Sequence, residues 1–289
     1  CAGPLQIQHR PVIRGEGPGF SSDLPLDPDH GHPDLADLCR AVAESPVPVV
    51  VLLHGRVTGP GAELALAARA RLADPACRIA FADITLGLCP SGGASQRLPR
   101  LVGPRMALEL LLGGRAVPAA EALAMGLVDG ISEGAALAPA LRLASALGPD
   151  GVLPRSRPDP AGWIAAVAEA RRNRQRRLPA PARIVDCVEA ALLLPPENGF
   201  AFEAAARADL EATPEAAGLA AAARAERRAL AVPPVLARLR PLTVDRIGLC
   251  GSSADLARAA GAPLSRGVEP TRALGSEAER PASLAAGPG

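Results

Sequence analysis

The chain has 289 residues, a formal net charge of +1 and 48% hydrophobic residues, enough for a sizeable apolar core. This charge balance argues against a nucleic-acid-binding protein, which usually carries a basic excess, and against an acidic disordered chain. All 31 basic residues are arginine, so chemistry that needs a Schiff-base lysine or a P-loop lysine is excluded.

Six widely spaced cysteines form no Cys-x-x-Cys pair, which indicates neither a zinc site nor a disulfide framework. They fit small buried apolar residues in a reducing compartment. No apolar stretch reaches the roughly 18–20 residues that cross a bilayer, and the N-terminus carries no signal-peptide pattern. We therefore expect a cytoplasmic protein without membrane or nucleic-acid partners. The first residue is Cys rather than Met, which suggests that residues are missing upstream.

Strands and helices alternate over the first half of the chain. In chain order, the pattern predicts a strand at 5–14, a helix at 35–45, a strand at 47–53, a helix at 62–73, a strand at 77–81, helices at 103–112 and 119–125, and a strand at 127–131. The run 47–53 (VPVVVLL) is apolar almost throughout, as in a strand that is covered on both faces of a parallel sheet. The alternation predicts an α/β fold with parallel strands.

The second half of the chain has a different character. A linker is expected at 154–160, and most of 161–239 favours helix, with breaks at prolines near 178–181, 195–196 and 233–234. The last fifty residues are expected to be weakly ordered apart from a short apolar segment at 244–250. We therefore expect three regions: an α/β domain at 1–150, a helical region at 151–240 and a tail at 241–289.

The most specific pattern lies within residues 46–131. The segment 54–67 (HGRVTGPGAELALA) joins a strand end, a glycine turn and a helix that bears a glutamate, and two further segments continue the pattern: 82–103 (ADITLGLCPSGGASQRLPRLVG) and 107–129 (ALELLLGGRAVPAAEALAMGLVD). Together they resemble the crotonase (enoyl-CoA hydratase/isomerase) family, and 12–22 (VIRGEGPGFSS) looks like that family's thioester-binding loop. The resemblance implies an α/β, crotonase-like ββα spiral followed by a helical C-terminal region.

The resemblance continues beyond residue 150. The stretch 203–227 is similar to the helical linker of multifunctional fatty-acid β-oxidation enzymes, in which a 3-hydroxyacyl-CoA dehydrogenase half follows the hydratase half. The segment 244–254 sits where that half's dinucleotide fingerprint would begin, but it keeps only Gly251 of three glycines, with about forty residues remaining. We interpret 241–289 as the remnant of a dinucleotide-binding domain start and expect no hydride transfer.

The family resemblance also implies a site. Its members hydrate an enoyl thioester with two backbone N–H groups that stabilise the enolate oxygen and two carboxylates that move protons. Carried over by position, the carboxylates are Glu63 and Asp83, and the N–H donors are those of Ser22 and of residue 60. Glu63 also fits an acidic first-turn residue favoured by the helix dipole, and Asp83 a polar cap after a strand. Within the motif, Glu63 is assigned as principal acid/base and Asp83 as its partner.

Several substrate-binding and catalytic positions depart from the family pattern. Pro60 replaces a glycine whose N–H completes the oxyanion hole, and proline has no N–H. Asp83 replaces a glutamate, so its carboxylate is expected to fall about 1 Å short of the substrate. In the substrate-binding loop Ser22 keeps an N–H, whereas Asp23 replaces a glycine and Leu24 an alanine. The carboxylate of Asp23 is expected to face solvent.

Other polar clusters allow a structural interpretation beside a functional one. The N–H groups of 91–95 (SGGAS) could hold the attacking water or a phosphate, or form a plain turn. Gln96 and Arg97 favour helix packing over ligand binding. The His and Asp residues of 27–34 favour a solvated loop over a metal site, and the basic run 171–177 (RRNRQRR) favours an exposed helix face over contact with CoA phosphates.

Two functional hypotheses follow. The first is an enoyl-CoA hydratase or Δ3–Δ2-enoyl-CoA isomerase of fatty-acid β-oxidation, and the isomerase needs only one well-placed base. The second is a catalytically impaired crotonase-fold protein that binds acyl-CoA or acts as a structural subunit, as Pro60 and Asp83 suggest. No metal is expected, and no cofactor beyond the coenzyme A of the substrate. A homo-oligomer is possible.

Overall fold

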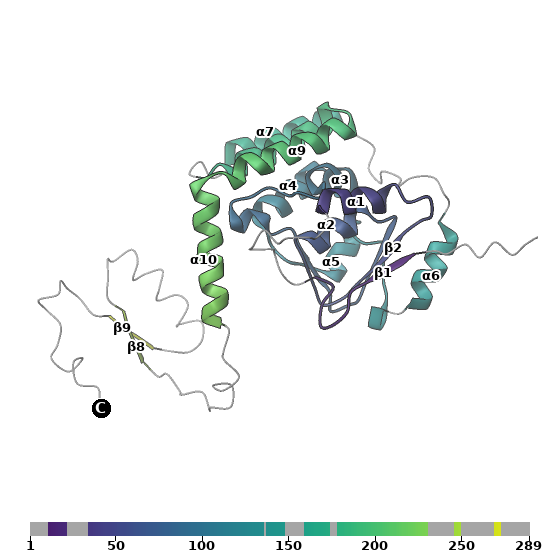
Figure 1. Ribbon diagram of the computed structural model, residues 1–289, viewed down its shortest axis with the longest axis horizontal. Coiled ribbons are helices and arrows are strands. Elements are labelled where there is room, and N and C mark those ends of the chain that lie inside the picture. Colours follow the sequence, from purple (N-terminus) through teal and green to yellow (C-terminus); the bar gives the residue numbers. More distant parts are fainter. Residues whose placement is uncertain are drawn as a thin grey trace, which may run out of the picture. The chain divides into compact units, whose positions relative to one another are not determined.

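The computed structural model describes residues 11–21, 34–135, 137–147, 159–173, 178–230, 246–249 and 269–272 (Figure 1). The chain divides into two units, residues 1–229 and 230–289. In the second unit, β8 (Arg246–Leu249) pairs in parallel with β9 (Glu269–Arg272). The expected weak order of the tail falls mostly on residues outside the described ranges. The predicted boundaries at 150 and 240 stay a prediction.

A four-stranded parallel sheet forms one layer of the first unit. Its strands lie in the order β1 (Val12–Arg14), β2 (Val50–Leu53), β4 (Ala70–Ala73) and β7 (Gly130–Ile131). Every residue of β2 is buried, and its side chains alternate between two apolar clusters, one on each face of the sheet. The predicted parallel α/β fold, with a strand covered on both faces, is confirmed.

A smaller sheet lies beside the first and leads into the helix that carries Glu63. It contains β3 (Arg56–Thr58), β5 (Arg78–Ala80) and β6 (Val117–Pro118), with β3 parallel and β6 antiparallel to β5. Ser21 extends this sheet through a parallel bridge to Val57. The bridge places the loop after β1 next to the chain that enters α2.

Helices and short 3₁₀ turns pack around the two sheets in the first half of the chain. They are α1 (Leu35–Ala43), α2 (Pro60–Ala67), η1 (Asp83–Leu86), α3 (Ala94–Val102), α4 (Pro104–Gly113), α5 (Ala119–Ala124), η2 (Glu133–Ala135) and α6 (Leu137–Ala146). Pro60 and Pro104 each begin a helix directly after a glycine with positive φ. Proline is tolerated there because the N–H of the first helical residue has no intrahelical partner.

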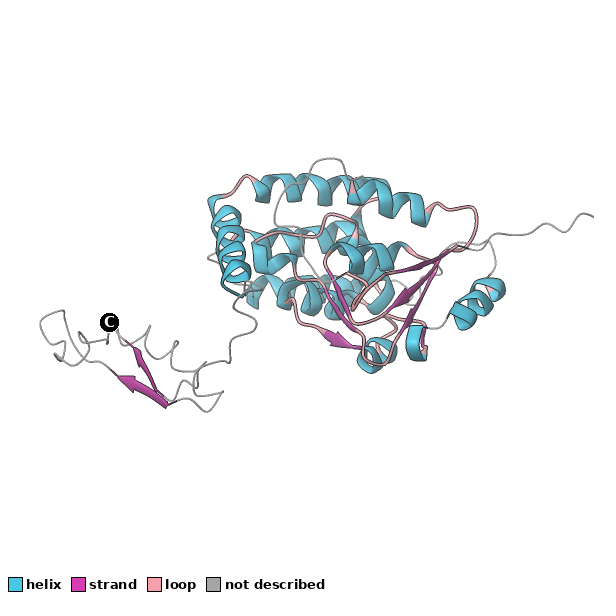
Figure 2. Cartoon of the chain, turned by 60° about the horizontal axis from the view of Figure 1, so that its bottom comes forward, coloured by secondary structure: helices cyan, strands magenta, loops and turns pink. Residues whose placement is uncertain are grey.

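Four longer helices follow: α7 (Pro160–Asn173), α8 (Ala180–Leu193), α9 (Pro196–Glu211) and α10 (Pro214–Leu230). Helix α8 contacts α3, α4, α7 and α9, and α9 also contacts α3. Trp163, Ile184 and Leu210 from these helices belong to the same apolar cluster as Val51 of the sheet. The later helices therefore complete the core, and Figure 2 shows the strands of this unit gathered on one side of them.

The prediction of one helix over 62–73 is wrong. That run favours helix because Ala, Leu and Arg all have high helix propensity. In the structure α2 ends at Ala67, and 70–73 forms β4, which pairs with β2 and β7 and is buried throughout. Pairing inside the sheet outweighs local propensity. The short strand β3 and the break between α9 and α10 were also not among the sequence predictions.

A buried ion pair connects β4 to both α2 and β7. The Arg71 side chain is 2% exposed, and its Nη2 lies 2.9 Å from Oδ2 of Asp129. Its Nη1 donates to the carbonyls of Ala65 and Ala68 at the end of α2. The backbone N–H of Arg71 donates to the same Asp129 oxygen over 2.8 Å. Arg71 and Asp129 thus fix the C-terminal end of the helix that bears Glu63.

We predict that Asp129→Ala lowers the free energy of unfolding by about 3 kcal/mol or more, because it removes a carboxylate that compensates a buried guanidinium. The matched control is Asp209→Ala, which removes an exposed pair with Arg183 and should cost less than about 1 kcal/mol. Urea unfolding followed by circular dichroism measures both. Equal losses in the two variants would contradict the role assigned to the buried pair.

Candidate active site

Glu63 lies in the first turn of α2, directly after the glycine–proline turn. Gly59 has φ +58°, and its carbonyl accepts the Glu63 N–H over 3.0 Å, which closes the first helical turn. A Cβ at Gly61 would lie 2.2 Å from the Cβ of Ser21, so only glycine allows this approach. The residues that follow β1, up to Ser21, therefore pack against the start of the helix that carries Glu63.

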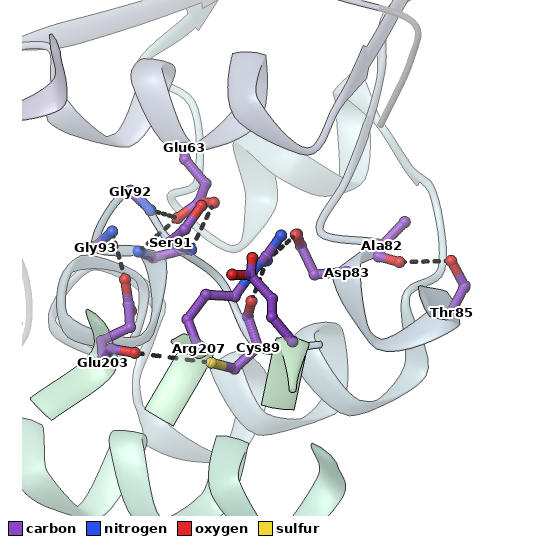
Figure 3. Close-up of polar contacts among 12 residues, drawn as sticks. Glu63, Ala82, Asp83, Thr85, Cys89, Ser91, Gly92, Gly93, Glu203 and Arg207 are labelled. Carbon is purple, nitrogen blue, oxygen red and sulfur yellow. Dashed lines mark hydrogen bonds and ion pairs between the residues drawn. The ribbon is translucent and has the colours of Figure 1, made fainter. Parts of the chain in front are cut away.

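The Glu63 carboxylate is 1% exposed and is held by main-chain donors (Figure 3). It accepts hydrogen bonds from the N–H groups of Ser91 (3.1 Å), Gly92 (2.7 Å) and Ala94 (3.1 Å). Burial raises the pKa of Glu63 to about 8, and the charges of Asp83 and Glu203 act in the same direction. A carboxyl with this pKa can gain and lose a proton near neutral pH.

A second carboxylate, from Glu203 in α9, binds the same turn from the other side. It accepts the N–H of Gly93 over 2.6 Å, the N–H of Ser95 over 2.9 Å and the hydroxyl of Ser95. Glu203 is 1% exposed, and burial raises its pKa while these hydrogen bonds oppose the rise. Glu203 was not among the site residues expected from the sequence.

We call residues 91–95 the anchor turn. All five of its consecutive N–H groups donate to a buried carboxylate: three to Glu63 and two to Glu203. The turn leads into α3, whose N-terminal dipole end favours negative charge. Gly93, at φ +93°, needs glycine because a Cβ there would also meet the Phe200 ring at 2.6 Å. These N–H groups thus bind two side chains, rather than the water or phosphate considered from the sequence.

Asp83 lies at the start of η1, and α9 determines its surroundings. Its Oδ1 lies 2.9 Å from Nη1 of Arg207, whose guanidinium also bonds Glu211 and the carbonyl of Cys89. The other oxygen, Oδ2, is buried and has no hydrogen-bond partner among the described residues. Burial raises the pKa of Asp83, and the Arg207 charge opposes the rise. Arg207, like Glu203, was not among the site residues expected from the sequence.

Of the two positions predicted to donate an N–H to the enolate oxygen, the structure describes residue 60 and not residue 22. Pro60 occupies the first position of α2, where the structure, like the sequence, offers no N–H. Ser22, Asp23 and Leu24 lie outside the described residues. The carbonyl of Ser21, the last described residue before them, accepts the Thr58 N–H over 2.8 Å, so Ser21 itself lies beside the chain that enters α2.

A cavity of about 380 Å³ borders the anchor turn between α1 and α9. Ser91, Gly92 and Gly93 line one side of it, and Arg97 and Phe200 lie on another. The Arg97 guanidinium carbon lies 4.6 Å from the centroid of the Phe200 ring. Glu63 is not among the residues that line this cavity.

The structure describes some of the other residues that the sequence offered as candidates for a functional role. Gln96 is fully buried and donates to the Cys187 carbonyl over 2.9 Å, which agrees with a packing role. Arg171 forms exposed ion pairs with Asp186 and Glu189, as expected of a solvated helix face. Residues 22–33 and 174–177 lie outside the described part. Within it, no cluster of His, Cys, Asp or Glu is arranged to hold a metal, and no helix has both the length and the apolar character of a membrane span.

The structure therefore brings Glu63 and Asp83 into one buried polar cluster, close enough for their charges to interact. Two unforeseen residues of α9, Glu203 and Arg207, complete this cluster. Their spacing of four residues was visible in the sequence, but it is also typical of an exposed pair on one helix face. Only the packing of α9 against α3 shows that both side chains point inward.

Comparison with known proteins identifies similar sequences and folds. Residues 28–146 match the family model described as "Enoyl-CoA hydratase/isomerase". The chain is 36% identical over 188 residues to the fatty acid oxidation complex subunit alpha of Shewanella amazonensis, a match that covers 60% of this chain. It spans only 26% of that relative's length.

Two solved structures share the fold. An enoyl-CoA hydratase from Mycobacterium avium subsp. paratuberculosis is 27% identical with a TM-score of 0.51, over 74% of this chain and 76% of that one. An enoyl-CoA hydratase/isomerase from Pseudoalteromonas atlantica is 22% identical with a TM-score of 0.53, over 74% and 78%, and shows the fold alone. The crotonase resemblance inferred from 54–67, 82–103 and 107–129 is confirmed: residues 28–146 of this chain match the enoyl-CoA hydratase/isomerase family model.

Proposed function

We propose that this chain binds an acyl-CoA thioester and isomerises a 3-enoyl-CoA to the conjugated 2-enoyl-CoA, with Glu63 as the base. Glu63 removes a proton from C2, the double bond moves from C3–C4 to C2–C3, and the same carboxyl returns a proton to C4. The observation that carries the proposal is the Glu63 carboxylate itself, buried, held by three N–H donors and with a pKa of about 8.

Asp83 favours isomerisation over hydration. A hydratase needs a second carboxyl group that exchanges a proton with water or substrate, whereas a one-base isomerase does not. Here one oxygen of Asp83 is held by Arg207, whose positive charge favours the ionised carboxylate, and the side chain is one methylene shorter than the family's glutamate. Oδ2 of Asp83 has no hydrogen-bond partner among the described residues, so it is available to exchange a proton. Slow hydration is therefore the secondary activity to test.

The likeness of this chain to a fatty acid oxidation complex subunit supports an acyl-CoA substrate of β-oxidation. We assign the acyl portion to the cavity beside the anchor turn, since it adjoins the main chain that holds Glu63. Self-assembly of the chain stays a prediction.

A second candidate function is acyl-CoA binding without efficient catalysis. Two observations favour it: Pro60 offers no N–H to the enolate oxygen, and Glu63 does not line the cavity. Loss of one oxyanion donor typically lowers kcat by about 100- to 1,000-fold. The two candidates differ in whether the unmodified chain turns over a 3-enoyl-CoA at all.

We predict that Glu63→Gln lowers kcat for isomerisation by at least about 100-fold and leaves KM nearly unchanged, because it removes the proton acceptor. Ultraviolet absorbance of the conjugated thioester measures the rate. Glu121→Gln is the matched control, since Glu121 is also a first-turn glutamate, in α5, but pairs with the exposed Arg115. Equal activities for Glu63→Gln and the unmodified chain would contradict the assignment, and hydration of crotonyl-CoA is assayed in parallel.

We predict that kcat/KM rises with pH and reaches half its maximum near pH 8. The base must be ionised, so activity is present above the pKa of Glu63 and is lost as pH falls through it. An initial-rate profile from pH 6 to pH 10 with a 3-enoyl-CoA measures the midpoint. A midpoint near pH 4.5, the ordinary value of a glutamate, would show that the base is not the buried Glu63.

We predict that Pro60→Gly raises kcat by about 100-fold, because it returns an N–H to the first position of α2. Pro104→Gly makes the same change at the first position of α4, after another positive-φ glycine, and should leave kcat unchanged. If the unmodified chain is inactive and Pro60→Gly is active, the second candidate function is correct. If Pro60→Gly gains nothing over Pro104→Gly, residue 60 is not part of the oxyanion site.

A further inference from the structure

We propose that Glu203 is a positioning residue for Glu63: from α9 it fixes the anchor turn, which in turn holds and orients the Glu63 carboxylate. The inference rests on the proposed function of Glu63 as the base. It assigns a role in the reaction to a helix that begins fifty residues beyond the matched family region.

The N–H donors of the anchor turn are divided between the two carboxylates. Glu63 takes the N–H groups of residues 91, 92 and 94, and Glu203 takes those of 93 and 95. The two carboxylates therefore share one short piece of main chain, and residues that bind Glu203 alternate with residues that bind Glu63. A shift of the turn toward or away from α9 changes the position of Glu63.

Glu203 is itself held by several hydrogen bonds. Besides the two N–H groups it accepts the Ser95 hydroxyl, and Ser95 Oγ accepts from Gln96, whose amide also donates to Cys187 of α8. One helical turn along α9, Arg207 binds Asp83 and the Cys89 carbonyl. Helix α9 thus positions both predicted carboxylates: Glu203 acts on Glu63 through the anchor turn, and Arg207 binds Asp83 directly.

The charge of Glu203 also acts on Glu63. The groups that face Glu63 are Asp83 from η1, Glu203 from α9, Arg97 from α3 and the Cys39 thiol from α1, while Arg207 acts through Asp83. Burial raises the pKa of Cys39 to about 12, so this thiol is neutral at the pH of an assay. Glu203 adds a negative charge that disfavours ionisation of Glu63, and removing that charge should lower the pKa of Glu63.

The main test compares Glu203→Gln with Glu203→Asp. The glutamine variant removes the charge and leaves one of the two N–H donors facing an amide nitrogen, so we expect kcat to fall about tenfold or more at nearly constant KM. The pH midpoint should move about one pH unit below that of the unmodified chain. The aspartate variant keeps the charge, so its midpoint should stay in place while kcat falls. Glu215 is an exposed glutamate in α10, and Glu215→Gln is the control for the loss of a distant negative charge.

A second readout is independent of catalysis. The pKa of Glu63 is measured by carbon-13 NMR titration of labelled glutamate carboxyl groups, with Glu63→Gln used to assign the resonance. A Glu63 pKa that is the same in Glu203→Gln and the unmodified chain overturns the inference, even if activity falls. A lowered pKa in a chain without turnover supports the contact between the two glutamates but overturns the proposed function, so the two failures are distinguishable.

A third variant keeps the inference falsifiable if Glu203→Gln does not fold. Ser95→Ala removes the hydroxyl, which donates to Glu203 and accepts from Gln96, and it leaves both N–H donors to Glu203. We expect it to fold, with kcat lowered about threefold to tenfold and KM and pH midpoint unchanged, since Glu203 loses one hydrogen bond but keeps its charge and both N–H donors. Unchanged kcat in folded Ser95→Ala would contradict the positioning role.

Discussion

The feature on which the site depends is a buried turn of main chain, residues 91–95, whose N–H groups hold two carboxylates. An isolated carboxylate is costly to bury, and N–H donors at a helix start are among the few partners that stabilise it without a positive side chain. Glu63 is therefore kept buried with its pKa raised rather than neutralised in an ion pair. A proton can be exchanged near neutral pH because of this balance between burial and hydrogen bonding.

The arrangement also explains why the helical half of the first unit matters for chemistry. Helix α9 packs on α3 and α8 and contributes Glu203 to the turn and Arg207 to Asp83. At the other end of α2, Arg71 binds the last carbonyls of the helix and the carboxylate of Asp129. Glu63 is thus fixed from three directions: by its own helix, by the anchor turn and, through that turn, by α9.

Much of the fold could be predicted from sequence, because the apolar run of β2 and the glycine–proline helix starts have direct local causes. Glu63 and Asp83 came from the family motif, and the structure places both in one buried cluster. The end of α2 could not be predicted, since alanine-rich residues favour helix until strand pairing decides otherwise. Glu203 and Arg207 could not be predicted either, because their spacing also fits a surface ion pair and their partners lie over a hundred residues away.

The role of Glu63 as the base is tested most directly by exchange of the C2 protons of a bound acyl-CoA thioester with solvent deuterium, followed by proton NMR. We expect exchange in the unmodified chain and none in Glu63→Gln, although acyl-CoA still binds to both. Exchange at the same rate in both proteins would contradict this role, because the proton would then be removed by a group other than Glu63.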